Sequence, residues 1–454
     1  MSDEELAAVL DAVGERVDPT PDERERLADA VERLKDRARD ALDEVAPDVD
    51  ADLVQVGSTA RGTWISGDRD IDLFVRFPAD LSRSELERIG LAVGNETLPE
   101  GHEEYAEHPY VVGTFEGYDV DLVPCFDVEA ATEIRTAVDR TPFHNAYLQE
   151  RLTDDLAADV RLLKQFLKGI GAYGSNLKTR GFSGYLTELL VVEYGGFVPV
   201  LETAADEWLP PVKLDPEDHA AETFDDPLVV IDPTDPERNV AAVVSAENVA
   251  RLQHYARDLL DDPDEDRFYP DLVEPLSPAD VRVHLDRRGT TPLAVRFGAP
   301  DLVEDQLYPQ LRRSLDGLER GLENAGFDVL RTATFADGDA VLFCELAVAE
   351  LPAVQRHDGP PVHVRQHAEG FYDKYEEADA YGPFLDGERY VVERDREVRT
   401  AEQFAREKLD SVALGQHVAS IVDAGDYDVL VDDEVADLAN DFGQALATYF
   451  DPEP

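Results

Sequence analysis

The spacing of apolar and polar residues predicts a long amphipathic helix near the start of the chain. Residues 20–23 read Thr-Pro-Asp-Glu, which is a capping box with proline at the first helical position. Downstream, apolar residues recur on one helical face, at Leu27, Val31, Leu34, Ala38 and Leu42. A helix with one apolar stripe buries that stripe, so we expect it to pack against the strands that follow.

Short apolar runs bounded by turn residues predict a sheet after this helix. The expected elements are strands at 53–56, 70–75, 110–115 and 118–123 and a helix at 82–93. Glu116 and Gly117 join the last two strands as a hairpin. The first third of the chain is therefore predicted to be a sheet covered by helices.

From residue 142 onward the pattern becomes helical. The expected helices are 144–152, 154–170, 181–194 and 245–260. The helix at 154–170 carries an apolar stripe and, at helical spacing, a basic stripe of Arg161, Lys164 and Lys168. Three cations on one face favour an anionic partner; the alternative is pairing with acids of the same helix. Residues 209–235 are rich in proline and acid and are predicted to be a surface loop, and 261–266 a linker.

Beyond the linker, strands and helices alternate again, which indicates an α+β region. The expected elements are strands at 292–297, 327–334 and 340–349 and helices at 303–325, 400–409 and 434–449. With 454 residues, more than one domain is expected.

The net charge of the chain indicates the solvent in which the protein works more than it indicates the fold. The chain has 100 acidic and 42 basic residues, a net charge of −58, yet 43% of its residues are hydrophobic, enough for a packed core. Such self-repulsion is tolerable where molar salt shortens the screening length to about 3 Å. We interpret this as a halophile's cytoplasmic protein, in which acidity says little about a nucleic-acid partner.

Several classes of protein are disfavoured. Two cysteines provide no disulfide framework, and the acidic N-terminus does not resemble a signal peptide. The most apolar stretch, 185–201, is too short to span a bilayer and is interrupted by Glu188 and Glu193. We expect a soluble protein without a membrane partner.

The residues that carry chemistry lie between positions 57 and 78. Gly57 and Ser58 form a tight turn into a helical start at 59–64, which leaves backbone N–H groups and a hydroxyl free to bind phosphate. Asp70 and Asp72 are two apart on a strand, so their side chains share a face. Two carboxylates beside a phosphate cradle predict a site for a divalent metal and a nucleoside triphosphate.

The hairpin adds a third carboxylate to this predicted site. Its second strand contains Asp119 and Asp121, which again share one face. Spacing does not choose between them; for Asp119 we favour a solvated position.

The segment Gly-Ser, Arg-Gly-Thr-Trp and Asp-x-Asp at 57–72 resembles the signature of the polymerase-beta nucleotidyltransferase superfamily. With Asp-Leu-Val-Pro-Cys at 121–125, the chain resembles the archaeal, class I CCA-adding tRNA nucleotidyltransferases over nearly its whole length. The resemblance selects Asp121 as the third carboxylate. In the family the first acid is often Glu, whereas here it is Asp70, which keeps the same ligand chemistry.

The resemblance also implies roles for residues outside the first motif. Ser58 and Arg61 from the first domain would hold the triphosphate, together with His144, Lys164 and Tyr173. Arg238 is the candidate for base selection, with a helix-cap role as the alternative. Asp70, Asp72 and Asp121 would hold a pair of Mg²⁺ ions.

By the same resemblance, the expected fold is an α+β multidomain chain. Residues 1–152 would form a polymerase-beta-type nucleotidyltransferase head, 153–265 a helical neck that contacts base and triphosphate, and 266–454 an RNA-recognition-motif-like body with a helical tail that binds tRNA. Exposed arginine pairs at 287–288 and 312–313 could meet RNA phosphates.

The implied activity is template-independent addition of C, C and A to the 3′ end of tRNA from CTP and ATP. A poly(A) polymerase or an oligoadenylate synthetase would share the motif and the metals, and a catalytically inactive RNA-binding relative is the alternative outside enzymes. The intact trio of Asp70, Asp72 and Asp121 speaks against the last. The sequence does not determine the oligomeric state, and a homodimer is possible.

Overall fold

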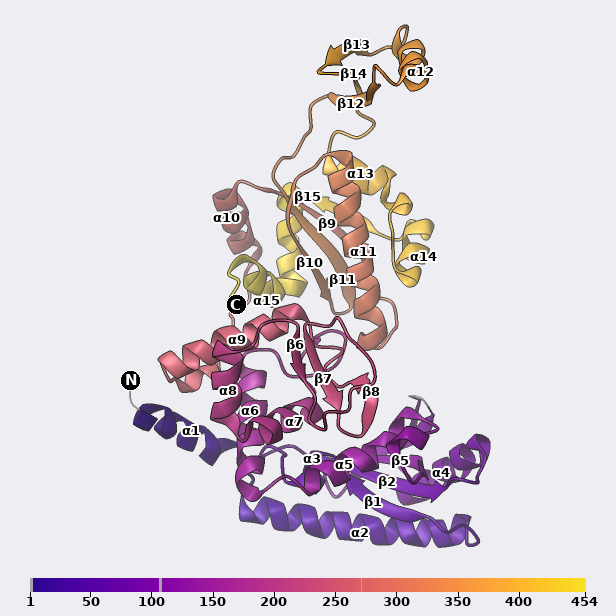
Figure 1. Ribbon diagram of the computed structural model, residues 1–454, viewed down its shortest axis with the longest axis vertical. Coiled ribbons are helices and arrows are strands. Elements are labelled where there is room, and N and C mark those ends of the chain that lie inside the picture. The colour runs from indigo at the N-terminus through magenta and orange to yellow at the C-terminus, as the bar shows by residue number, and fades with distance from the viewer. Residues whose placement is uncertain (1–2, 106–107, 271) are drawn as a thin grey trace. The chain divides into compact units, whose positions relative to one another are not determined.

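A computed structural model describes residues 3–105, 108–270 and 272–454. The chain divides into two compact units, Met1–Asp271 and Leu272–Pro454. Figure 1 shows that each unit contains both sheets and helices.

The first unit contains a five-stranded sheet in the order β1-β2-β5-β4-β3. The strands are β1 (Asp52–Val56), β2 (Asp70–Pro78), β3 (His102–Tyr105), β4 (Pro109–Phe115) and β5 (Tyr118–Asp127). Strands β2 and β5 are parallel, and the other neighbours are antiparallel. The predicted hairpin is confirmed as β4 and β5, joined at Glu116 and Gly117.

Two helices cover one face of this sheet, α2 (Pro21–Val45) and α4 (Arg83–Thr97). Both begin with a capping box, at Thr20 and at Ser82. The predicted apolar stripe of α2 is buried against the strands, which confirms the sequence pattern. Close packing requires glycine in α4, because a Cβ at Gly90 would lie 2.5 Å from the side chain of Pro124.

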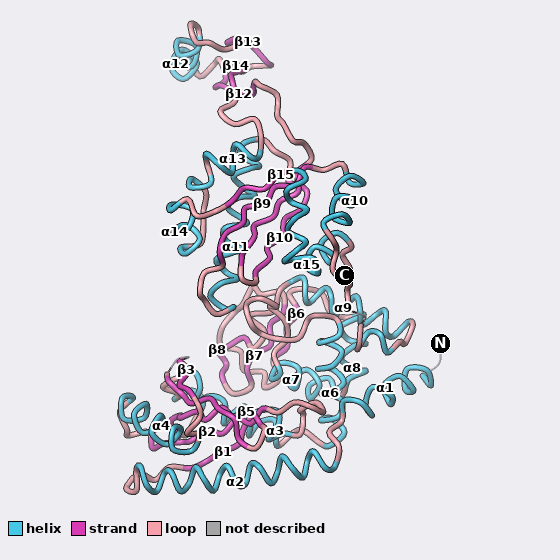
Figure 2. Tube along the Cα trace, turned by 180° about the vertical axis from the view of Figure 1, so that it is seen from behind, coloured by secondary structure: helices cyan, strands magenta, loops and turns pink. Residues whose placement is uncertain are grey.

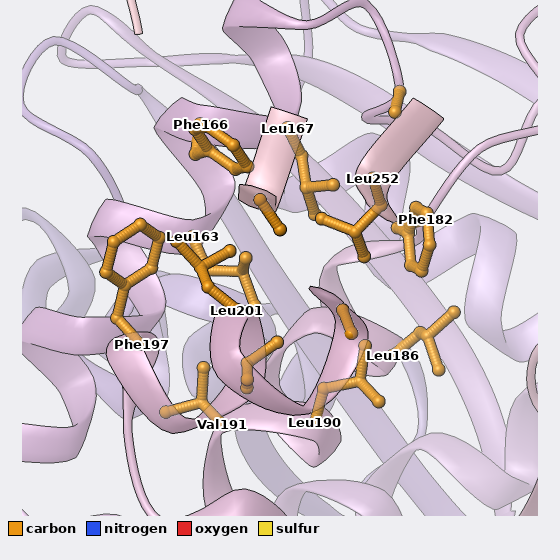
Figure 3. Close-up of a cluster of buried hydrophobic side chains, with 14 of the residues drawn as sticks. Leu163, Phe166, Leu167, Phe182, Leu186, Leu190, Val191, Phe197, Leu201 and Leu252 are labelled. Carbon is orange, nitrogen blue, oxygen red and sulfur yellow. The ribbon is translucent and has the colours of Figure 1, made fainter. Parts of the chain in front are cut away.

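Helices dominate the rest of the first unit. They are α1 (Asp3–Val17), α3 (Gly57–Arg61), α5 (Thr141–Gln149), α6 (Asp154–Gly169), α7 (Gly184–Tyr194), α8 (Phe197–Asp206) and α9 (Ala246–Asp261). Leucine and phenylalanine side chains from α6 to α9 interlock in one core (Figure 3). Within the described residues, no single helix is long and apolar enough to cross a membrane; α7 and α8 pass that test only when joined, with a bend of 89° between them.

The surface loop predicted for 209–235 is wrong. The segment contains β6 (Val212–Leu214) and β7 (Leu228–Asp232), which pair with each other, and β7 also pairs with β8 (Asp235–Asn239). Every residue of β7 is buried. Its run Leu-Val-Val-Ile is a strand signal that the surrounding prolines and acids concealed.

The second unit is built on a four-stranded antiparallel sheet in the order β10-β11-β9-β15. Its strands are β9 (Thr291–Gly298), β10 (Val329–Ala336), β11 (Asp339–Leu346) and β15 (Asp428–Val431). The helices α11 (Glu304–Ala325), α13 (Ala401–Glu407) and α14 (Gln416–Ala424) pack in one apolar cluster, and α10 (Pro278–Arg288) and α15 (Ala439–Phe450) in another. Figure 2 shows this sheet between its helices, as the alternation predicted.

A small lobe is inserted between β11 and α13. It is a three-stranded sheet in the order β12-β14-β13 with one helix. Its elements are β12 (Val354–Pro361), α12 (Arg365–Tyr375), β13 (Tyr381–Asp386) and β14 (Arg389–Asp395). The likeness of the second unit to an RNA-recognition motif stays a prediction.

Candidate active site

The parallel pairing of β2 and β5 brings the predicted carboxylates together. Asp72 lies opposite Asp121, and Asp70 lies opposite Asp119. Alternate residues of a strand share a face and neighbouring strands are about 4.8 Å apart, so all four carboxylates project from one face of the sheet. Asp70 and Asp119 are at the exposed end, whereas Asp72 and Asp121 are half-buried.

Burial and neighbouring acids together raise the pKa values of Asp70, Asp72 and Asp121. Burial, followed by repulsion from Asp121 and Asp70, raises the pKa of Asp72 to about 6. Burial and neighbouring acids also raise the pKa values of Asp70 and of Asp121. A site that disfavours negative charge on its own carboxylates is suited to a cation.

The carboxylates of β2 and β5 do not by themselves form a closed set of metal ligands. Among residues 3–105, 108–270 and 272–454, no group of three or more His, Cys, Asp or Glu side chains is gathered closely enough to hold a metal ion as it stands. Their oxygen donors nevertheless match the ligand preference of Mg²⁺.

Gly57 is required where the phosphate turn meets the carboxylates. Its φ is +77°, and a Cβ there would lie 1.9 Å from Oδ2 of Asp72. The helix α3 begins at Gly57, whereas the sequence pattern predicted a helical start at Thr59. Ser58 therefore lies in the first turn of α3.

A cavity of about 300 Å³ lies beside these residues. Gly57, Asp72 and Asp121 line it, together with His108 and Thr141. The two central carboxylates thus face an open space that a substrate can enter.

Arg61 is held by residues that the sequence did not single out for it. Its Nε and Nη2 donate to the two carboxylate oxygens of Glu188, at 3.2 and 2.7 Å, and its Nη1 donates to Oδ1 of Asn145 at 2.9 Å. These bonds use three of the five guanidinium N–H groups and leave two for a ligand. Glu188 is fully buried. In the sequence, Glu188 stands out only as an acidic residue among the apolar residues of α7.

The basic stripe of α6 finds its partners outside α6. Arg161 pairs with Asp18 at 2.6 Å and also donates to the carbonyl of Gly62. Lys164, which is only 4% exposed, donates to the carbonyl of Thr63 at 2.9 Å. Lys168 lies 3.8 Å from Asp68. The alternative of pairing with acids on the same helix is therefore wrong, because these bonds run to the N-terminal segment and the motif loop.

Tyr173 lies next to Lys164. A Cβ added at Gly184 would lie 3.1 Å from the Tyr173 hydroxyl and 3.9 Å from Cε of Lys164. Burial, with a contribution from the charge of Glu188, raises the pKa of Tyr173. Its hydroxyl thus stays protonated and can act as a hydrogen-bond donor.

His144 and Arg238 meet at a shared carboxylate, Asp232. Nε2 of His144 and Nη1 of Arg238 both lie 2.7 Å from Oδ2 of Asp232, and the His144 ring stacks on Tyr185 at 3.9 Å. Asp232 is fully buried, and burial alone would raise its pKa, but hydrogen bonds from His144 and Thr234 keep that pKa below its usual value. Burial lowers the pKa of His144.

Asp232 was missed because it ends the strand that was interpreted as a loop. In β8, Arg238 precedes Asn239, whose side chain bonds to β7 at the amide of Val230 and the carbonyl of Leu228. A helix-cap role for Arg238 is wrong, because the N-cap of the following helix is Ser245.

The sheet, the facing carboxylates and the phosphate turn define a nucleotidyltransferase. Three family models match the chain in sequence: a nucleotidyltransferase domain at 35–144, the second domain of tRNA nucleotidyltransferases at 158–269, and the C-terminal domain of CCA-adding enzymes at 288–432. The chain belongs to the family of CCA-adding enzymes.

Full-length relatives support this assignment. The chain is 64% identical over 452 residues to the CCA-adding enzyme of Halobacterium salinarum, covering 99% of both chains. It is 60% identical over 466 residues to that of Halorubrum lacusprofundi, covering 99% of this chain and 100% of the relative. A solved structure of the RNA terminal uridylyl transferase Cid1 aligns at 18% identity with a TM-score of 0.45 over 59% of this chain and 97% of its own, too distant to add to the assignment.

Proposed function

We propose that this chain adds C, C and A in turn to the 3′ end of tRNA in the cytoplasm, using CTP and ATP and releasing pyrophosphate. The observation that carries the proposal is the register of β2 and β5, which sets Asp72 opposite Asp121 beside the turn at Gly57. Nucleotidyl transfer needs alignment and charge neutralisation more than covalent chemistry from the protein.

Asp70, Asp72 and Asp121 are the residues that would hold Mg²⁺. They supply hard oxygen donors, and a nearby cation would offset the burial and the repulsion that raise their pKa values. When bound, the metal would lower the pKa of the attacking 3′-hydroxyl and neutralise charge on the departing pyrophosphate.

The triphosphate would lie between the turn of α3 and the helices α6 and α7. Ser58 contributes its hydroxyl, and Arg61 contributes the two N–H groups that its partners leave over. Lys164 and Tyr173, which both lie next to Gly184, would add an ammonium and a hydroxyl. These groups hold the phosphates in line with the carboxylates, so that the reacting atoms meet in one geometry.

Base selection would depend on His144, Arg238 and the carboxylate that joins them. Asp232 fixes the orientation of both side chains. Cytosine and adenine each present an amino donor next to a ring acceptor, whereas uracil and guanine present the opposite pattern. One fixed set of polar groups can therefore accept both correct bases and reject the other two.

The test is incorporation into tRNA that lacks its 3′-terminal CCA, in molar KCl with Mg²⁺ and one triphosphate at a time. We expect two C residues from CTP alone, and one A from ATP only after both C residues are present. Repeated incorporation of A from ATP alone would contradict the proposal and would support a poly(A) polymerase.

A further inference from the structure

Glu188 is a buried carboxylate to which the mechanism above assigns no role. It lies in α7 and is 0% exposed. Its oxygens accept three hydrogen bonds, two from the guanidinium of Arg61 and one from the hydroxyl of Thr63. A buried carboxylate is tolerated only when it is paired in this way.

Glu188 is connected by hydrogen bonds to the motif segment and, through Thr63, to Lys164 in α6. Arg61 and Thr63 belong to the motif segment that follows β1. The carbonyl of Thr63 also accepts the bond from Lys164 in α6, so Thr63 links that lysine to Glu188. The carboxylate of Glu188 opposes the effect of burial on the pKa of Lys164.

Glu188 shares a helix face with a second contact to the site. Gly184 is four residues before Glu188, and residues four apart lie on the same side of a helix. The Cα of Gly184 lies beside the Tyr173 hydroxyl and the side chain of Lys164. One face of α7 therefore borders Arg61, Lys164 and Tyr173.

We propose that Glu188 is a positioning residue for the nucleoside triphosphate, which fixes Arg61 so that its two remaining N–H groups point as a rigid pair toward the phosphates. The proposal rests on the proposed function, because it takes Arg61 as a phosphate ligand. Two parallel bonds define the plane of a guanidinium, whereas one bond leaves it free to rotate.

The negative charge of Glu188 also sets the electrostatics of the site. Arg61 and Lys164 place two cations within one buried region, and Glu188 balances one of them. With glutamine at 188, Arg61 would meet an amide that supplies a single acceptor oxygen and a competing donor. Arg61 would then lose one of the two parallel bonds that define the plane of its guanidinium.

The experiment compares Glu188→Gln with a matched control in the second unit, Glu345→Gln. Glu345 is also fully buried and accepts two bonds from Arg288 and one from Thr290, so both variants lose the same kind of pair. With tRNA lacking CCA in molar KCl, we expect Glu188→Gln to raise KM for CTP about 30-fold and to change KM for tRNA less than 3-fold. Glu345→Gln should lower the Tm without changing KM for CTP.

A double variant separates positioning from a purely structural role. If Glu188 acts through Arg61, adding Glu188→Gln to Arg61→Gln should cause no further loss of kcat/KM beyond about 3-fold. If Glu188→Gln does not fold, Glu188→Asp, which keeps the charge and draws it back from Arg61, takes its place in the same cycle.

Three results would overturn the inference: losses that multiply in the double variant, an equal rise in KM for tRNA, or a rise in KM for CTP with Glu345→Gln. Failure of the proposed function is distinguishable from all of these. It would show in the unaltered protein, as failure to add two C residues and then one A.

Discussion

Residues 61–63 and 288–290 both read Arg-Gly-Thr, and each compact unit uses its copy in the same way. In both, the arginine ends a helix and the glycine caps it with a positive φ, +71° at Gly62 and +63° at Gly289. In both, the arginine and the threonine bind one fully buried glutamate, Glu188 in the first unit and Glu345 in the second.

The two clasps, as we name these Arg-Gly-Thr–Glu groups, differ in what surrounds them. The Arg61 side chain is 8% exposed and has the carboxylate strands nearby, whereas Arg288 is 34% exposed and its glutamate is completed by the hydroxyl of Tyr449. Two nitrogens of Arg288 bind Glu345, and a contact of Arg288 with RNA phosphates stays a prediction. The same local chemistry therefore has different neighbours in the two units, and any difference in function between the clasps has to come from those neighbours.

The largest effect is expected when a carboxylate near the first clasp is removed. Asp72→Asn should lower kcat about 10,000-fold, because it would remove one of the three carboxylates proposed to hold Mg²⁺. The clasp itself would stay intact, since Asp72 makes no bond to it. Single-turnover addition of C to tRNA measures the effect, and a residual rate within 10-fold of the unaltered protein would contradict it.

The same variant should be more stable than the parent, in a pH-dependent way. Because the pKa of Asp72 is raised from 3.8 to about 6, the folded state binds its proton more tightly, and stability is lost as pH rises through this range. A shift of that size corresponds to at most about 3 kcal/mol. With EDTA, Asp72→Asn should raise the Tm at pH 7.5 and leave it unchanged at pH 4; a pH-independent change would contradict the assignment.

Asp232 is another buried carboxylate that holds functional side chains in place, namely those of His144 and Arg238. Asp232→Asn should lower kcat/KM for CTP and ATP about 100-fold, because His144 and Arg238 lose the group that orients them. Breaking this buried pair should also lower the free energy of unfolding by about 3 kcal/mol. Misincorporation of UTP is the diagnostic measurement: it should rise if Asp232 orients base-reading groups, and an unchanged ratio of UTP to CTP use would assign Asp232 to stability alone.

Local spacing predicted part of the carboxylate site. Alternation placed Asp70 and Asp72 on one face, and the turn at Glu116 and Gly117 predicted the hairpin that contains Asp121. The choice of Asp121 over Asp119 came from the family resemblance, and the parallel pairing of β2 and β5 that sets Asp121 opposite Asp72 is a long-range contact. The capping box at Thr20 likewise set the start of α2. Short-range rules of this kind need no knowledge of distant contacts.

The groups that position the site could not be predicted in this way. Glu188 is 127 residues from Arg61, and Asp232 is 88 residues from His144. An acid in an acidic chain carries little local signal, and only the fold shows which acids are buried. Polar residues within or at the end of apolar runs, such as Glu188 in α7 and Asp232 at the end of β7, were the available clue.

Exchanging both arginines for lysine tests how far the two clasps are equivalent. Lysine keeps the charge but cannot form the two parallel bonds to a carboxylate. We expect Arg61→Lys and Arg288→Lys each to lower the free energy of unfolding by about 1–3 kcal/mol, with the smaller loss at the more exposed Arg288. Only Arg61→Lys should raise KM for CTP, by about 10-fold; a similar rise with Arg288→Lys would remove the distinction between the clasps.

The smallest effect is expected from the threonine hydroxyls. Thr63→Val and Thr290→Val each delete one bond to a buried glutamate and preserve side-chain shape, so each should cost about 1–2 kcal/mol of stability. The backbone carbonyl of Thr63 would still accept the bond from Lys164, so KM for CTP should rise no more than about 3-fold in Thr63→Val. Urea unfolding of both variants measures the loss of stability, and steady-state kinetics measure KM for CTP. A rise in KM as large as that of Glu188→Gln would mean that the hydroxyl, and not the ion pair with Arg61, determines where the phosphate-binding groups lie.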